Sequence, residues 1–145
     1  MLPFLCPAMM DLIVFLVPSA VSYSIGDRHL PLLQCAWLNG ICLFTYMLTS
    51  LAVGWILSRR NARVLLLAST ATTILSGAGG LACRAFWPTF AWMALFGIAI
   101  AFFFNSFQTF MRGEAPPGGL ARVTALYTLS WSTGAGLGFL TSGVF

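Results

Sequence analysis

Asp11 is the residue whose type and position most clearly point to chemistry, because its carboxyl group lies inside a long apolar segment. A carboxylate at the centre of a membrane helix costs about 2.5–3.5 kcal/mol on insertion scales, so such a residue usually faces a partner or a water-filled cavity. In that setting Asp11 is a candidate for carrying a proton or for binding a charged group. The alternative is that Asp11 lies near the cytoplasmic headgroups, at the start of its helix.

Polar residues also interrupt two other apolar segments, where they either bond across helices or line a solvated path. We select Asn39, Tyr46 and Asn105 as candidates for a substrate or proton pathway. Helix packing alone is the competing explanation. The same segments carry further polar residues: Thr45, Thr49 and Ser50 in one, and Ser106, Gln108 and Thr109 in the other.

Groups that would support catalysis or metal binding are not expected. His29, the only histidine, lies in a polar break, and Glu114 follows Arg112 by two residues in a predicted turn. Neither has a convergent second group, so we predict no catalytic residues and no enzyme activity. The four cysteines contain no Cys-X-X-Cys pair, and we interpret them as small apolar residues within helices: Cys6, Cys35, Cys42 and Cys83. No cofactor and no metal site is predicted.

The composition indicates the class of protein to which these residues belong. Of 145 residues, 59% are hydrophobic and 7% are charged, whereas about a quarter of the residues in a soluble domain are charged. A water-soluble fold of this size could not bury so much apolar surface. The net charge of +4 comes from seven arginines in short gaps between apolar segments. Membrane topology explains that placement, so nucleic-acid binding is not expected.

Five apolar segments are long enough to cross a bilayer, which takes about 20 residues. They must be helices, because an isolated span has to satisfy its own backbone hydrogen bonds in lipid. The predicted fold is therefore an all-α transmembrane bundle forming one domain over 1–145, with helices at about 3–24, 30–57, 64–83, 87–111 and 120–145. The odd number of helices leads us to expect a piece of a longer protein, a natural five-helix protein being the alternative.

Arginine placement predicts the orientation. Positive residues concentrate in cytoplasmic loops, and a cytoplasmic N-terminus puts five arginines inside and two outside. The inner set is Arg59, Arg60, Arg63, Arg112 and Arg122, and the outer set is Arg28 and Arg84. We therefore expect a protein of the plasma or inner membrane with its N-terminus in the cytoplasm.

Small residues recur at every fourth position in the last segment, where Gly134 and Gly138 lie between Ser130 and Ser142. Stripes of this kind let helix backbones approach closely. Helix packing is the role that we predict for Gly134 and Gly138.

The loop between the second and third segments resembles the signature loop of the major facilitator superfamily. Gly54, Ile56, Arg59 and Arg63 match the family pattern. Ser58 stands where the family has an aspartate that contributes to a cytoplasmic latch. Other departures are Leu57 for a small residue, Asn61 for a glycine, Ala62 for an arginine, and Met93 for the usual fourth-helix arginine.

The resemblance implies the N-terminal half of a secondary transporter, whose two six-helix bundles bind a small-molecule substrate between them and alternate access to it. It covers essentially the whole chain, including a Gly-rich fifth-helix segment at residues 127–138. The expected partners are the lipid bilayer, the substrate and the remaining helices of a longer transporter. The alternative function is a small accessory or structural subunit of a membrane complex.

Overall fold

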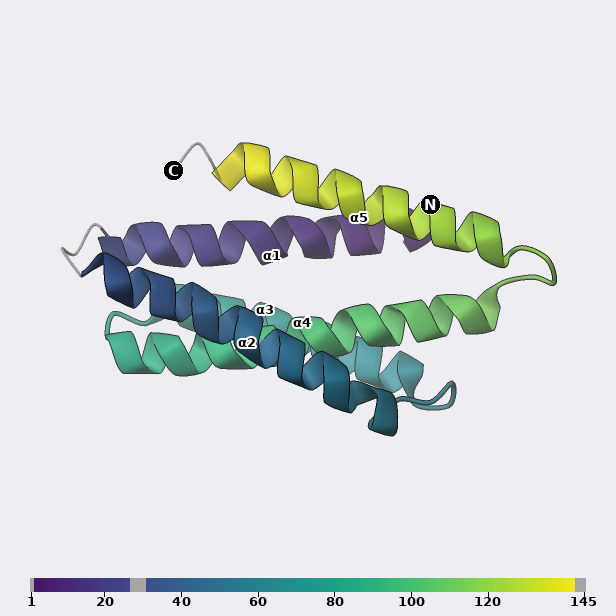
Figure 1. Cartoon of the computed structure of the whole chain (residues 1–145), viewed down its shortest axis with the longest axis horizontal. Helices are drawn as coiled ribbons and strands as arrows, with labels where there is room; N and C mark the ends of the chain where they lie inside the picture. Colours follow the sequence, from purple (N-terminus) through teal and green to yellow (C-terminus); the bar gives the residue numbers. More distant parts are fainter. Residues whose placement is uncertain (1, 27–30, 143–145) are drawn as a thin grey trace.

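The computed structural model describes residues 2–26 and 31–142, and in that part of the chain every regular element is an α-helix. The prediction of an all-α bundle is confirmed. Five helices follow one another up and down the molecule (Figure 1). Their bounds are α1 Leu2–Gly26, α2 Leu32–Ile56, α3 Ala62–Ala82, α4 Phe86–Glu114 and α5 Leu120–Ser142.

The predicted helix ends agree with these bounds to within a few residues. The largest difference at a described end lies at the C-terminus of α4, which continues three residues beyond the expected end, to Glu114. Arg112 in its last turn is favourable there, because a cation complements the negative end of the helix dipole. The predicted start of the second helix at Leu30 and the predicted end of the fifth at Phe145 lie outside the described residues.

Four helices, α1 to α4, are long and apolar enough to cross a membrane, as judged over the described residues. The chain is therefore a membrane protein. We predicted five spans, but α5 is not among these four. It has the length, at 23 residues, but its many Ser, Thr and Gly residues make it the least hydrophobic of the five helices.

The helices form two packed groups. The long helix α4 packs along both α2 and α3, and α5 packs along α1 (Figure 1). Contacts between the groups are fewer and are made mainly by α1, which touches α2, α3 and α4. The core is centred on α4, where Met93, Phe96 and Phe103 are fully buried.

Helices α2 and α4 cross closely at Gly97, a position without a side chain. A Cβ atom added at Gly97 of α4 would collide with the carbonyl oxygen of Cys42 and with the hydroxyl of Thr45 on α2. At this crossing the Thr45 hydroxyl lies 3.0 Å from the carbonyl oxygen of Ala94, and its single hydrogen is shared between that oxygen and the carbonyl oxygens of Ile41 and Cys42 in its own helix, at 2.9 and 3.1 Å. The missing side chain and the hydrogen bond together hold α2 against α4.

Candidate functional site

Asp11 lies in the first half of α1 and faces inward, with 2% of its surface exposed. Its neighbour on α5 is Gly134, where an added Cβ atom would lie 2.8 Å from the Cβ of Asp11 and would also collide with the carbonyl oxygen of Ala8. Asp11 therefore sits at the closest approach of α1 and α5. Its side chain is therefore enclosed by protein.

The carboxyl group is incompletely satisfied. Its Oδ2 atom is buried and has no hydrogen-bond partner among the described residues. A buried polar atom without a partner costs free energy, and the cost rises with charge. Such an atom therefore indicates a site that a proton, a water molecule or a ligand completes.

Tyr127 of α5 connects Asp11 to the other helices. Its hydroxyl accepts a hydrogen bond of 3.2 Å from Nε2 of Gln108 on α4, and its ring stacks on Phe107 with 5.8 Å between centroids. Asp11 on α1 and Tyr46 on α2 are near enough to influence the charge of this hydroxyl, and no hydrogen bond joins either of them to it among the described residues. We group the hydrogen-bonded pair with these two neighbours, from four helices in all, as the polar site: Asp11, Tyr46, Gln108 and Tyr127.

A cleft of about 230 Å³ opens between the end of α4 and the start of α5. Gln108 and Tyr127 of the polar site line it, and the exposed Arg112 lies on its rim. The other lining residues are Met111, Val123, Thr124 and Thr128. The cleft is therefore an approach to the polar site from the end of the bundle at which the chain passes from α4 to α5.

The loop that forms this end is a tight turn. The amide of Gly119 donates to the carbonyl oxygen of Pro116 at 2.8 Å, and Gly118 between them has φ +76°. Glycine adopts that left-handed conformation without steric cost. The turn keeps the ends of α4 and α5 adjacent at the mouth of the cleft.

The other two pathway candidates lie elsewhere. Asn39 of α2 donates to the hydroxyl of Ser22 on α1 at 3.0 Å and to the carbonyl of Cys35 at 3.1 Å. Asn105 donates to the carbonyl of Ala101 within α4 at 2.8 Å. Asn39 thus ties two helices together, and the hydrogen bond of Asn105 stays within its own helix. Of the four predicted pathway residues, Asp11 and Tyr46 are the two that influence the charge of Tyr127.

The signature-like loop is held by Asn61. Its Oδ1 accepts the amide of Ser58 at 2.7 Å, and its Nδ2 donates to the carbonyl of Ile56 at 2.8 Å. Arg59 and Arg63 are exposed. The side chain at position 61, where the family pattern has a glycine, therefore stabilises the turn between α2 and α3. Gly54 is also exposed, and an added Cβ there would meet nothing within 4 Å.

The glycine stripe on α5 lies against α1. Gly134 and Gly138 are both buried, and an added Cβ at Gly138 would lie 2.7 Å from the Cβ of Phe15. One turn before Gly134, the hydroxyl of Ser130 donates to the carbonyl of Phe4. These contacts bring the backbones of the two helices together around Asp11.

Sequence reasoning did not select Gln108 or Tyr127 as site residues. Both carry a polar tip within an otherwise apolar helix, and that signal was available for each of them. Choosing them required knowing that their faces of α4 and α5 meet.

No cluster of three or more His, Cys, Asp and Glu side chains suited to a metal ion exists within residues 2–26 and 31–142. The four cysteines are free thiols. Comparison of the chain with protein-family models, with curated proteins and with solved structures gives no match.

Proposed function

We propose that the chain is part of a secondary transporter that moves a small solute across a membrane by alternating access, with Asp11 binding a proton or a positive charge of the solute. The observation that carries the proposal is the polar site. Asp11 is buried where α1 packs on α5, and its Oδ2 has no partner among the described residues. Ionisable groups inside membrane bundles mark ion and substrate pathways.

The packing of the bundle supports a moving site. Asp11 and Tyr127 belong to the pair α1 and α5, whereas Tyr46 and Gln108 belong to the group α2 to α4. Because contacts between the two groups are fewer than contacts within them, a shift of one group against the other would open or close the polar site. Transport requires a change of this kind.

We further propose that the fold is of the major facilitator type and that the N-terminus faces the cytoplasm. The support is the loop at residues 54–63 and the excess of arginines at its end of the bundle. The matching residues of the loop are Gly54, Ile56, Arg59 and Arg63. In that orientation the cleft between α4 and α5 opens towards the cytoplasm.

Uptake by membrane vesicles that contain the intact protein tests the proposal. A panel of radiolabelled sugars, amino acids and organic cations is offered with and without an imposed pH gradient. At least one solute is expected to accumulate, and Asp11→Asn is expected to reduce that uptake to background. Glu114→Gln is the matched control, because it removes an exposed carboxyl group at the end of α4.

Wild-type uptake by the Asp11→Asn variant would remove Asp11 from the mechanism. If no solute enters faster than into vesicles without the protein, the transport proposal fails, and the accessory-subunit function becomes the better explanation.

A further inference from the structure

Three exposed arginines lie where α2 passes into α3, and we call them the arginine junction: Arg59, Arg60 and Arg63. No ion pair joins them to a carboxylate in the described part of the chain. Asn61 holds the same turn through its two hydrogen bonds to the backbone. The junction therefore presents three positive charges on a fixed piece of backbone, and the described residues do not neutralise them.

Exposed apolar side chains adjoin the arginine junction on both helices. Trp55, in the last turn of α2, has 92% of its surface exposed, and Ile56 beside it is also exposed. Val64 and Leu67 are exposed at the start of α3. Both helices pack on α4 and not on each other, so neither covers the side chains of the other. The junction is thus flanked by two apolar surfaces that are open to lipid.

The depth of the junction in the bilayer follows from the same two helices. Both α2 and α3 are long and apolar enough to cross a membrane, and the arginines lie between the end of one and the first turn of the other. Tryptophan at a helix end is typical of the membrane–water interface, where lipid headgroups lie. Trp55 therefore places the arginine junction at headgroup depth.

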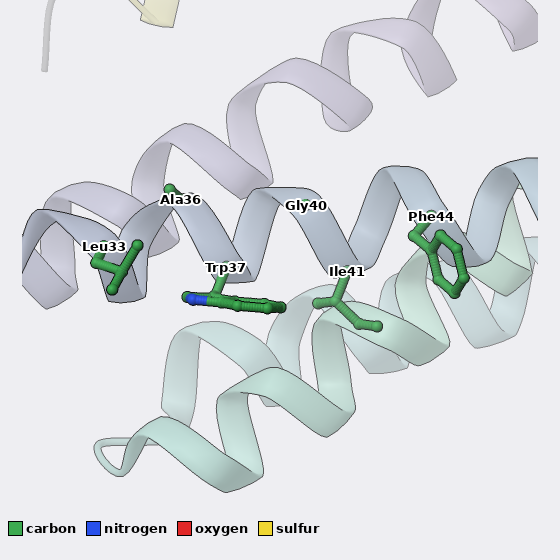
Figure 2. Close-up of a pocket in the computed structure, with 6 residues that line it drawn as sticks. All are labelled: Leu33, Ala36, Trp37, Gly40, Ile41 and Phe44. Atoms are coloured by element: carbon green, nitrogen blue, oxygen red, sulfur yellow. The ribbon is translucent and has the colours of Figure 1, made fainter.

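The first half of α2 offers a comparison, because its exposed surface is apolar and carries no charge (Figure 2). Six residues of α2 line that surface: Leu33, Ala36, Trp37, Gly40, Ile41 and Phe44. The hydrophobic effect is not directional, so such a surface accepts the acyl chains of different lipids alike and does not select a headgroup. The arginine junction, at the other end of α2, adds a charge that can select one.

We propose that the arginine junction binds an anionic phospholipid. The guanidinium groups hold the lipid phosphate, which their planar fork of donors matches, and the acyl chains lie along Trp55 of α2 and Val64 of α3. A zwitterionic lipid fits less well, because its ammonium group is repelled by the same arginines. The adjoining apolar side chains favour a lipid over a soluble phosphate. This site is separate from the polar site and does not depend on the transport proposal.

Native mass spectrometry of the intact protein in detergent micelles tests the proposal. Equal amounts of phosphatidylglycerol and phosphatidylcholine with the same acyl chains are added, and the lipids that remain on the protein are counted. A basic residue near an anionic lipid surface strengthens binding about fivefold. We therefore expect the protein to prefer phosphatidylglycerol by at least about tenfold. The preference should fall as ammonium acetate is raised, because salt screens exposed charges.

The variant that removes the site replaces all three arginines: Arg59→Gln, Arg60→Gln and Arg63→Gln. The matched control has the same net charge and replaces three arginines elsewhere: Arg84→Gln, Arg112→Gln and Arg122→Gln. We expect the first variant to lose the preference for phosphatidylglycerol by about tenfold or more and the control to keep it. Equal losses in the two variants would overturn the site, because they would reflect net charge alone.

Two results with the wild-type protein would also overturn the proposal. One is equal retention of phosphatidylglycerol and phosphatidylcholine, which would show that the arginines do not select a headgroup. The other is displacement of the bound lipid by excess glycerol phosphate, which carries the anion without the acyl chains. Displacement would show that the junction binds a soluble anion and not a lipid, whereas retention of the lipid is the result that we expect.

Discussion

Substitution of Gly134 by alanine tests whether α1 and α5 meet as closely as the structure shows. The new Cβ atom would lie 2.8 Å from the Cβ of Asp11 and 2.9 Å from the carbonyl carbon of Ala8, and it would collide with the Ala8 carbonyl oxygen. Carbon atoms prefer separations of about 3.5–4.0 Å. Because two of these three atoms are backbone, rotation of a side chain cannot relieve the overlap, and α5 must move away by roughly 1 Å.

The cost follows from that displacement. Forcing an extra carbon into a packed interface costs about 1–3 kcal/mol. Alanine also raises helix propensity, so the matched control is Gly136→Ala on the same helix, where the added Cβ meets nothing within 4 Å. Both variants gain the same propensity, and the difference between them isolates the overlap. Gly138→Ala should also be less stable than Gly136→Ala, because the nearest atom to its added Cβ is the Cβ of Phe15 at 2.7 Å, which is fixed to the backbone of α1.

The assay measures the free energy of unfolding in mixed micelles. Tryptophan fluorescence is followed as sodium dodecyl sulfate is added. Gly134→Ala is expected to be less stable than Gly136→Ala by about 1–3 kcal/mol. A difference within about 0.5 kcal/mol, which is typical of surface substitutions, would show that α5 does not pack on α1 through this face.

Two further substitutions test hydrogen bonds that hold the bundle together. Thr45→Val removes the bond to the Ala94 carbonyl that links α2 to α4, and should lower the free energy of unfolding by about 0.6 kcal/mol, at most about 1.7. Thr72→Val, whose hydroxyl bonds within its own helix, should cost less in the same micelle titration, and equal costs would contradict the interhelical bond. Asn61→Ala removes both loop bonds and should speed trypsin cleavage after Arg59, whereas Asn61→Asp, which keeps the acceptor, should give an intermediate rate. Equal cleavage of all three proteins would show that Asn61 does not hold the loop.

The helices could be predicted from sequence because the signals are local. Apolar segments of about 20 residues separated by arginines or turn residues define each helix, and the bilayer leaves few alternatives. The prediction of a membrane span is not matched at α5, which is not among the four apolar helices. The Gly and Ser residues that let this helix pack on α1 also lower its hydropathy.

The site could be predicted in part. Asp11 and Tyr46 stand out as polar residues in apolar segments, and both belong to the polar site. The other two residues, Gln108 and Tyr127, could not be chosen from the sequence, because no local sequence feature shows which faces of α4 and α5 meet. The same limit applies to Asn39, whose bond to Ser22 spans two helices. Pairing between helices depends on the whole arrangement of the bundle.

The central claim is that water and solute reach the polar site through the cleft between α4 and α5, and thiol labelling tests it most directly. With the four native cysteines replaced by alanine, Thr124→Cys places a thiol in the cleft, and Leu129→Cys places one on the exposed apolar surface of the same helix. Thiols react with maleimide as thiolates, which form in water and not in lipid. In the native membrane, a membrane-impermeant maleimide should modify Thr124→Cys quickly from the cytoplasmic side and Leu129→Cys slowly, and a transported solute should slow the first reaction. Equal rates at the two positions would contradict the claim.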